Sequence, residues 1–272
     1  MTPTLPGRGD PEGPSRELAA AIAAARAAGE VALRHLGSSR FELKSDHSIV
    51  TAADVECEDT VRSVLAPLGI PVIGEERSDE AAVAGLASLE RAWVVDPIDG
   101  TASFAVALPG FGVEIGLLER GVPVLGVFYQ PWTDELYAAD RTGTGTWGRQ
   151  AVRGALTPET LDERAFFCSP SDAHHHHMIR FPGKVRALGS TALHVALVAR
   201  GAAIGALISP HVWDVAGVAP LLERAGGAFF RLDSGEKVDF AAWVQEGAPE
   251  RDLLVCAPES LPPLRQFVSR RP

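Results

Sequence analysis

The sequence predicts a mixed α/β protein built from two closely packed halves, and three observations support this prediction. The chain has 272 residues, which is long for one compact domain and short for two complete ones. Residues 113–139 consist mostly of strand patterns separated by turn residues, which indicates an antiparallel meander. From about residue 165 onward, helix and strand patterns alternate, as in folds whose helices cover sheets.

The first half begins with an irregular lead and a long helix. Residues 1–14 are polar and rich in Pro and Gly, so we expect a disordered lead that lacks a signal-peptide pattern. An Ala-rich helix is expected from about Arg16 to Leu36. Ser15 is its expected N-cap, and Gly37 is expected to end it.

Shorter elements follow this helix. Residues 41–44 are expected as a short strand, and residues 51–54 have the capping-box pattern that begins a helix. Residues 81–90 are expected as another helix. Residues 92–95 form a short apolar strand that is expected to end at Asp96-Pro97.

A Gly/Thr loop at residues 141–148 follows the meander and separates the two predicted halves. The first half is therefore predicted as residues 15–145 and the second as residues 146–272. In the second half, strands are expected at AFFCS, AAIGALIS, AFFRL and DLLVCA. Helices are expected at STALHVALVARG, at WDVAGVAPLLERAGG and after Pro258.

Composition and charge exclude several classes of partner. A formal net charge of -10 argues against nucleic acid, which needs a basic surface, but an acidic pocket can still bind an anion through cations. No apolar run approaches the length of a membrane span, so no membrane contact is expected. The widely spaced Cys57, Cys168 and Cys256 are expected as reduced core residues, which favours a cytoplasmic location.

The segment WVVDPIDGT, residues 93–101, carries the strongest chemical signal. A buried strand ends in Asp96, and Asp99 follows three positions later, so both carboxylates can point at one place together with the Ile98 carbonyl. Hard cations such as Mg²⁺ prefer oxygen ligands of this kind. The N–H groups of the two residues that follow can face an anion, as at the start of a helix.

Each acidic residue also has a purely structural alternative. Asp-Pro and Asp-Gly pairs form ordinary turns. Glu75 follows a short apolar run and can be a solvated surface charge. Asp214 opens a predicted amphipathic helix and can stabilise its N-terminus. It is the combination of the three segments that favours a shared site.

The segments VIGEE, WVVDPIDGTASF and WDVAGVAPLLERAGG, in this order, resemble motifs of the inositol monophosphatase family of lithium-sensitive, metal-dependent phosphatases. KSDHSIVTAAD, PVLGVFYQPWTDELYAAD and GSTALHVALVARG are similar to further motifs of that family, so the resemblance covers about residues 15–260. It implies a layered αβαβα sandwich, related to fructose-1,6-bisphosphatase, with the site between the halves. It also implies a homodimer.

The resemblance implies roles for individual residues. The implied ligands of two or three Mg²⁺ ions are Glu75, Asp96, the Ile98 carbonyl, Asp99 and Asp214. Asp54 and Thr101 would form a hydrogen-bonded pair that orients the attacking water, with Glu75 as a further catalytic residue. Gly100 and Thr101 would bind the phosphate through their N–H groups.

The implied reaction is hydrolysis of a small, inositol-phosphate-like phosphomonoester by in-line attack of a metal-activated water. Lys44, Ser103 and Ser190 are implied on the substrate side of the site. Two features depart from the family pattern: Ser103 replaces the usual Asn, and residues 201–210 lack the usual acidic residues. A buried polyol hydroxyl needs an acceptor, so the alcohol part of the substrate is expected to differ.

Other functions remain open. A phosphatase of 3′-phosphoadenosine 5′-phosphate, histidinol phosphate or a sugar bisphosphate would use the same fold. A non-catalytic protein that binds phosphorylated metabolites, or a scaffold, would be expected to have damaged metal ligands, whereas all of them are present here. The run His174–His177 is either a solvated segment or a group in which one histidine touches substrate; histidine runs can also bind transition metals.

Overall fold

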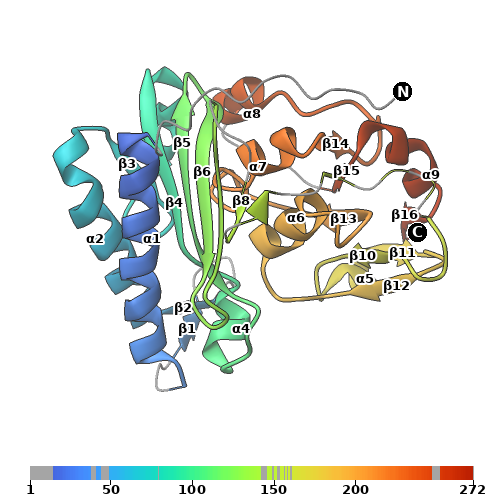
Figure 1. Ribbon diagram of the computed structural model, residues 1–272, viewed down its shortest axis with the longest axis horizontal. Coiled ribbons are helices and arrows are strands. Elements are labelled where there is room, and N and C mark those ends of the chain that lie inside the picture. The colour runs from blue at the N-terminus through green and yellow to red at the C-terminus, as the bar shows by residue number, and fades with distance from the viewer. Residues whose placement is uncertain are drawn as a thin grey trace.

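The computed structural model describes residues 15–37, 41–43, 49–78, 80–141, 146–148, 150–151, 154–155, 157, 159, 161–246 and 252–271. The predicted lead at residues 1–14 and Lys44 lie outside these described residues. Figure 1 shows helices and sheets in alternating layers, with α6 and α7 between the two main sheets. The predicted layered α/β architecture is therefore confirmed.

The first main sheet has seven strands in the order β3-β4-β5-β6-β7-β8-β9. Its strands are β3 (Val72–Gly74), β4 (Arg91–Asp99), β5 (Gly112–Glu119), β6 (Val122–Gln130), β7 (Glu135–Asp140), β8 (Thr146–Trp147) and β9 (Gln150–Ala151). Only β3 and β4 pair in parallel, and the other neighbours are antiparallel. The predicted meander is confirmed in β5, β6 and β7.

Two helices, α1 (Arg16–His35) and α2 (Ala52–Leu65), cover the outer face of this sheet (Figure 1). The Ser15 hydroxyl accepts a hydrogen bond from the Leu18 N–H at 3.2 Å, which confirms the predicted N-cap. The buried face of α1 consists largely of alanine, and such small side chains let a helix pack closely on its neighbours. Thr51 and Asp54 form the predicted capping box of α2.

The second main sheet has five strands in the order β12-β10-β13-β15-β14. Its strands are β10 (Phe166–Cys168), β12 (Lys184–Arg186), β13 (Gly205–Ile208), β14 (Ala228–Arg231) and β15 (Leu253–Cys256). Two two-stranded sheets pair β1 (Phe41–Leu43) with β2 (Ile49–Thr51) and β11 (His177–Ile179) with β16 (Val268–Arg270). The strand β16 was not predicted from the sequence.

The remaining helices are short. They are α3 (Glu80–Gly85), α4 (Thr101–Ala105), α5 (Ala173–His176), α6 (Thr191–Ala199), α7 (Ala219–Arg224), α8 (Phe240–Glu246) and α9 (Leu261–Arg265), with 3₁₀ turns at Ala66–Leu68, Leu86–Ser88 and Pro258–Ser260. The predicted helix at residues 81–90 is therefore split into α3 and a 3₁₀ turn. In the described part of the chain, no helix is long and apolar enough to cross a membrane. All three cysteines are free and buried.

The strand β4 extends beyond its predicted end. We expected it to end at Asp96-Pro97, but β4 continues to Asp99. Its pairing with β5 shifts between Asp96 and Asp99, where three steps along β4 match two along β5. Such a bulge accommodates Pro97, which has no N–H to donate to a ladder. The strand therefore delivers both aspartates to one end of the sheet.

The helix predicted to begin at Trp213-Asp214 begins later in the structure. Residues 213–218 form successive turns, and α7 begins only at Ala219. Two causes are visible. Pro220 has no N–H for a helical bond, and the N–H groups of Gly217 and Val218 both donate to the Glu114 side chain from β5 instead of only to preceding carbonyls.

The two main sheets share a core cluster. Phe128 and Tyr137 from the first main sheet are fully buried in the same cluster as Val195 of α6 and Leu222 of α7. Gly126 on β6 lets the backbone at Gly217 pack directly on the sheet, because a Cβ at residue 126 would overlap the Gly217 backbone. This close approach holds residues 216–217, which belong to the same turns as Asp214, against the face of the sheet.

Candidate active site

The end of β4 places two aspartates in the interior. Asp96 and Asp99 are 3% and 5% exposed. The Ile98 N–H donates to Asp96 Oδ1 at 3.0 Å, so the bulge itself orients one carboxylate. Within the sequence Asp-Pro-Ile-Asp, the bulge keeps the second aspartate at the same end of the strand as the first.

The Asp99 carboxylate connects the two halves of the molecule. It accepts hydrogen bonds from the Ser190 hydroxyl, from the Thr191 N–H at 3.1 Å and from the Ala192 N–H at 2.7 Å. These donors form the N-terminus of α6, where backbone N–H groups and the helix dipole favour negative charge. Ser190, predicted on the substrate side, therefore binds Asp99 and also caps α6 through Leu193.

Gly100 makes the sharp turn from β4 into α4. Its φ of 91° lies in the left-handed region, and a Cβ would overlap the carbonyl oxygen of Gly110 and crowd that of Gly189. Thr101 is the first residue of α4, as the sequence predicted. Ser103, also in α4, lies directly against Gly189, so this predicted substrate-side residue faces the loop that leads into α6.

Thr101 and Asp54 form the hydrogen-bonded pair that the resemblance implies. Thr101 Oγ1 lies 3.2 Å from Asp54 Oδ1 and 2.9 Å from the Ile98 carbonyl oxygen. Asp54 Oδ2 accepts from the N–H and hydroxyl of Thr51 at 2.8 and 2.6 Å. Burial, with a smaller contribution from the Glu75 charge, raises the pKa of Asp54 to about 6 against the lowering effect of these bonds. Such a pair can hold a polar molecule and accept a proton near neutral pH.

Glu75 and Asp214 approach from two other segments. Glu75 follows β3, and its N–H donates to the Val95 carbonyl of β4 at 3.1 Å, so it lies beside the end of β4. Asp214 Oδ2 accepts from the His211 N–H at 2.8 Å, and the His211 ring stacks on Trp213 at 4.7 Å. A turn rather than a helix start therefore orients the Asp214 carboxylate.

The pKa shifts indicate that these carboxyl groups lie close enough to repel one another when ionised. Burial raises the pKa of Asp96 well above its usual range, and the charges of Glu75, Asp99, Asp214 and Glu114 raise it further, in that order. Burial likewise raises the pKa of Asp99 to about 6, although the hydrogen bonds from α6 oppose that shift. Buried acids that repel one another are unfavourable unless protons or cations compensate them.

Glu114 belongs to this cluster, although it was not predicted from the sequence. It is fully buried on β5, where Oε1 accepts from the Gly217 and Val218 N–H groups at 2.7 and 3.1 Å. Oε2 has no hydrogen-bond partner among the described residues. Burial, followed by the charges of Asp99 and Asp214, raises its pKa well above the usual range. The detectable signal was a single acid inside the apolar run GVEIGLL.

The residues suit hard cations chemically, although their carboxylates do not converge on one point. Carboxylate and carbonyl oxygens are what Mg²⁺ prefers, and the mutual repulsion of the acids is relieved by divalent ions. Within the described ranges, no three His, Cys, Asp or Glu side chains gather round one point as ion ligands. One reason is that Asp99 is turned toward the N-terminus of α6.

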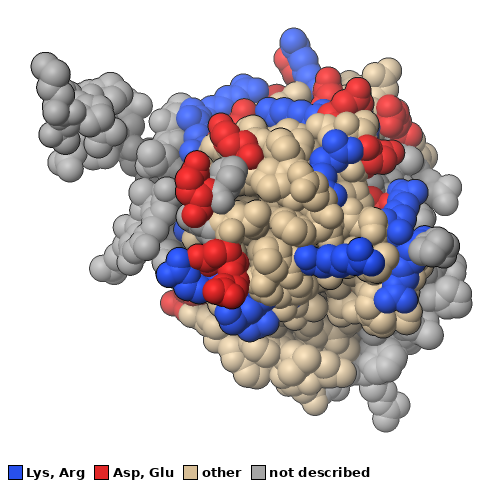
Figure 2. All heavy atoms as spheres, turned by 90° about the vertical axis from the view of Figure 1, so that its right-hand side faces the viewer, with Lys and Arg blue, Asp and Glu red and all other residues tan. Residues whose placement is uncertain are grey.

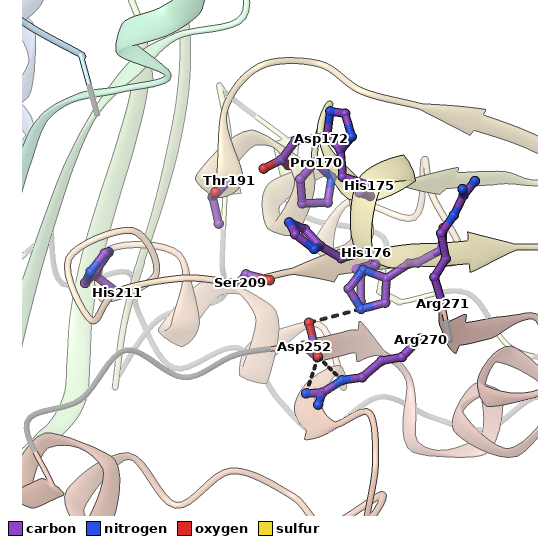
Figure 3. Close-up of a pocket in the computed structure, with 13 residues that line it drawn as sticks. Pro170, Asp172, His175, His176, Thr191, Ser209, His211, Asp252, Arg270 and Arg271 are labelled. Carbon is purple, nitrogen blue, oxygen red and sulfur yellow. Dashed lines mark hydrogen bonds and ion pairs between the residues drawn. The ribbon is translucent and has the colours of Figure 1, made fainter. Parts of the chain in front are cut away.

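The histidine run lies beside this site. His174 Nδ1 donates to the Ser171 carbonyl oxygen at 3.0 Å, whereas His175, His176 and His177 line a cavity of about 930 Å³ (Figure 3). His177 is buried and lies 3.1 Å from Asp252. The lining also includes Leu207 of β13, and β13 carries no acidic residue, as its sequence predicted.

A model of the inositol monophosphatase family matches residues 14–261. This chain belongs to the inositol monophosphatase family. Members of the family are phosphatases. The chain is 33% identical to an inositol-1-monophosphatase of Mesorhizobium japonicum over 229 residues, which cover 79% of this chain and 85% of that protein. It is also 33% identical to a histidinol-phosphatase of Chlorobaculum parvum over 230 residues, with the same coverage.

The structural comparison agrees with the family. The inositol monophosphatase of Anabaena (Nostoc) matches with a TM-score of 0.71 and 27% identity, over 92% of this chain and 94% of that one. Equal identity to two relatives named for different substrates means that overall similarity does not select a substrate for this chain. That information has to come from the walls of the site.

Proposed function

We propose that this chain is a Mg²⁺-dependent phosphatase of small phosphomonoesters, and that it uses two or three ions per site. The observation that carries the proposal is the buried acidic cluster at the end of β4, next to the Thr101–Asp54 hydrogen bond. The proposed ligands are Glu75, Asp96, the Ile98 carbonyl, Asp99 and Asp214. When bound, the ions would activate water for attack and neutralise charge on the phosphate.

The residues of the chain have distinct proposed tasks around the phosphate. The Asp54–Thr101 pair, with Glu75, would hold the attacking water in line with phosphorus and take up its proton. The N–H groups of Gly100 and Thr101, at the turn where only glycine fits without strain, would donate to phosphate oxygens. The sequence contains no serine-elbow pattern, in keeping with direct attack by water rather than a covalent intermediate.

The proposed substrate is an inositol-phosphate-like phosphomonoester, and its alcohol part is left open. Relatives named for inositol phosphate and histidinol phosphate are equally similar to this chain. The four residues of β13, Gly205–Ile208, are buried and apolar, so they offer no acceptor for a sugar or polyol hydroxyl. The test panel should therefore include inositol-1-phosphate, histidinol phosphate, fructose-1,6-bisphosphate and 3′-phosphoadenosine 5′-phosphate.

Phosphate release from p-nitrophenyl phosphate, with Mg²⁺ or with EDTA, tests the reaction class. We expect activity that disappears in EDTA and returns with excess Mg²⁺. The Asp96→Asn variant should lose about 100-fold or more in kcat, equivalent to about 3 kcal/mol of transition-state stabilisation. Asp162→Asn is the matched control, because the charge of this aspartate is paired with its exposed neighbour Arg164, away from the acidic cluster.

Two results would refute the proposal. Undiminished activity in EDTA would exclude the metal reaction. An Asp96→Asn protein as active as the unaltered one would exclude the proposed site.

We also propose a cytoplasmic homodimer that lithium inhibits. Three buried free thiols are compatible with a reducing compartment, and the dimer and the lithium effect rest on family membership alone. Light scattering coupled to gel filtration measures the mass in solution against the 28.8 kDa chain. Substituting LiCl for NaCl in the phosphatase assay tests inhibition.

A further inference from the structure

The helix α2 carries two buried acidic side chains, and only one of them belongs to the site described above. Asp54 forms a hydrogen bond with Thr101, whereas Glu58 lies one helical turn later on the same face of α2. The Glu58 side chain is 0% exposed. Because a carboxylate buried to this extent is unfavourable without compensating donors, the donors that surround Glu58 indicate its role.

Ion pairs at the surface provide a contrast to Glu58. Figure 2 shows Lys and Arg side chains next to Asp and Glu side chains at one end of the molecule. Exposed pairs of this kind, such as Arg164 with Asp162, contribute little to stability because water screens both charges. The charge of Glu58 is instead compensated inside the protein, where the loss of a partner has a larger effect.

Two donors to Glu58 come from the turn that carries Glu75. The Glu76 N–H donates to Glu58 Oε2 at 2.7 Å, and the Arg77 N–H lies 3.2 and 3.3 Å from the two carboxylate oxygens. These N–H groups belong to the two residues that directly follow Glu75. Gly74, which precedes it, leaves room for the carboxylate, because a Cβ there would lie 2.3 Å from Glu58 Cδ. The Glu58 side chain therefore packs directly against this turn.

Arg62 connects the same carboxylate to the strand β3. Its Nε donates to Glu58 Oε1 at 2.9 Å, and its Nη1 donates to the Val72 carbonyl oxygen of β3 at 2.7 Å. Its Nη2 donates to Ser78 Oγ at 3.2 Å, and this oxygen also accepts from the Gly74 N–H at 2.9 Å. The ion pair of Glu58 and Arg62 therefore contacts the chain on both sides of the turn.

The backbone of Glu75 is consequently fixed from two directions. Its own N–H donates to the Val95 carbonyl oxygen of β4 at 3.1 Å. Gly74 pairs with Val95 in parallel strands, so Glu75 and Asp96 follow at the same end of the sheet. The N–H groups after Glu75 are bound to α2 through Glu58. On a fixed backbone, a side chain has only a few staggered conformations, so the position of the Glu75 carboxylate is restricted.

We propose that Glu58 is a positioning residue of the metal site, because it binds the turn that carries Glu75 to the helix that carries Asp54. This inference rests on the proposed function, in which Glu75 is a Mg²⁺ ligand and Asp54 orients the attacking water. The two acids lie near each other: burial raises the pKa of Asp54, and the Glu75 charge adds to that rise. Movement of the turn relative to α2 would disturb the geometry that the ligand and the water-orienting pair share.

Mn²⁺ binding tests the proposal without relying on activity. Mn²⁺ takes the same oxygen ligands as Mg²⁺, and electron paramagnetic resonance measures the free ion. In Glu58→Gln, an NH₂ group replaces one acceptor oxygen and faces a donor of either Arg62 or the turn, so the turn should loosen. We expect the Mn²⁺ dissociation constant to rise by about 10-fold or more. The Mg²⁺ concentration that gives half-maximal phosphatase activity should rise by a similar factor.

Amide hydrogen exchange, followed by mass spectrometry, tests the turn itself. Glu58→Gln should speed exchange by about 10-fold or more in a peptide that spans residues 72–78, because the Glu76 and Arg77 N–H groups lose an acceptor. Exchange in β15, which belongs to the second main sheet, should stay the same. Unchanged exchange in residues 72–78 would show that Glu58 does not fix this turn.

Two further variants separate positioning from general stability. Val61→Ala is the matched control, because Val61 is fully buried in the core on the same helix, and its truncation should lower Tm while Mn²⁺ affinity stays within about two-fold. Arg62→Lys keeps the charge but loses the forked donors, so Mn²⁺ affinity should weaken by about three-fold or more. The Arg62 side chain is 30% exposed, so this variant serves as the test if Glu58→Gln does not fold.

The outcomes distinguish failure of the positioning role from failure of the proposed function. If Glu58→Gln and Arg62→Lys bind Mn²⁺ as tightly as the unaltered protein, the positioning role is wrong, whether or not the protein is active. Equal weakening in Val61→Ala would also overturn it, because a general loss of stability would then explain the effect. If the unaltered protein binds Mn²⁺ and the variants weaken binding as expected, but no phosphate is released, only the phosphatase reaction is refuted.

Discussion

Replacing Glu114 by Gln and by Ala separates two effects of one buried carboxyl. Its Oε1 accepts from the Gly217 and Val218 N–H groups, and its Oε2 has no partner among the described residues. Gln keeps the accepting oxygen and removes the ionisable group. Ala leaves the buried Gly217 N–H without an acceptor, which costs about 1–3 kcal/mol, whereas the Val218 N–H keeps its bond to the Val215 carbonyl at 3.2 Å. We therefore expect Glu114→Ala to lower the free energy of unfolding by about 1–3 kcal/mol, and Glu114→Gln to stay within about 1 kcal/mol of the unaltered protein at low pH.

The pH dependence has a definite sign. The pKa of Glu114 is raised in the folded protein, so the folded state binds this proton more tightly than the unfolded chain does. Stability is then lost as pH rises above the ordinary carboxyl pKa of 4.5 toward the raised value, by up to about 1.4 kcal/mol per pH unit for this proton. Glu114→Gln removes this loss, so its stability relative to the unaltered protein should increase between about pH 5 and about pH 8.

Urea unfolding followed by tryptophan fluorescence, in EDTA at about pH 5 and about pH 8, measures the free energies of unfolding of the unaltered protein and of both variants. In the unaltered protein, Mg²⁺ should weaken the pH dependence, because cations at the neighbouring acids favour ionised Glu114. If Glu114→Gln destabilises the protein as much as Glu114→Ala does, then accepting hydrogen bonds as an uncharged group is not the stabilising role of Glu114. Equal pH dependence in Glu114→Gln and the unaltered protein would contradict the assigned pKa shift.

Three further outcomes follow from the site. Asp99 must lose its proton to bind a cation, so the apparent Mg²⁺ affinity should fall as pH drops through about 6. Calorimetry in two buffers of different ionisation enthalpy should detect the proton released on Mg²⁺ binding. An affinity that does not change with pH would contradict the role of Asp99 as a Mg²⁺ ligand. Thr101→Val should lower kcat by about 100-fold or more with little change in Tm, and Thr101→Ser should restore much of it, as steady-state kinetics can show. His194 accepts from the Leu188 N–H at 3.0 Å, and burial lowers its pKa to about 4. Its folded form binds fewer protons than the unfolded chain, so stability should fall as pH drops from 6.5 toward 4. His194→Gln should reduce that fall in thermal melts, and an unchanged fall would exclude His194 as its source.

The sequence predicted those parts of the site that depend on local chain order. The turn at Gly100 and the capping box at Asp54 each follow from a few consecutive residues with strong conformational preferences, whereas β4 continues to Asp99, past its predicted end at Asp96-Pro97. The layered fold was also predictable, because the strand and helix patterns are long and alternate. In each of these cases, the short-range signal and the tertiary packing favour the same structure.

The parts that the sequence did not predict depend on contacts between distant segments. The helix expected from Trp213 is replaced by turns because Glu114, about a hundred residues earlier, accepts the N–H groups of Gly217 and Val218. The strand β16 forms only because Val268–Arg270 meets His177–Ile179, and three residues carry too little periodicity to identify a strand alone. Arg270 lines the cavity beside His177 through that same pairing, so its place there could not be predicted from the sequence.

The bonds between Asp99 and the start of α6 have a consequence for how this protein can change by mutation. One carboxylate, on a strand of the first half, satisfies the hydroxyl of Ser190 and two backbone N–H groups of the second half. An apolar residue at this position would leave those donors unpaired between the two halves. Selection for a folded chain alone would therefore preserve this aspartate. A descendant that had lost its catalytic role would be expected to keep Asp99 long after Thr101 or Glu75 had drifted.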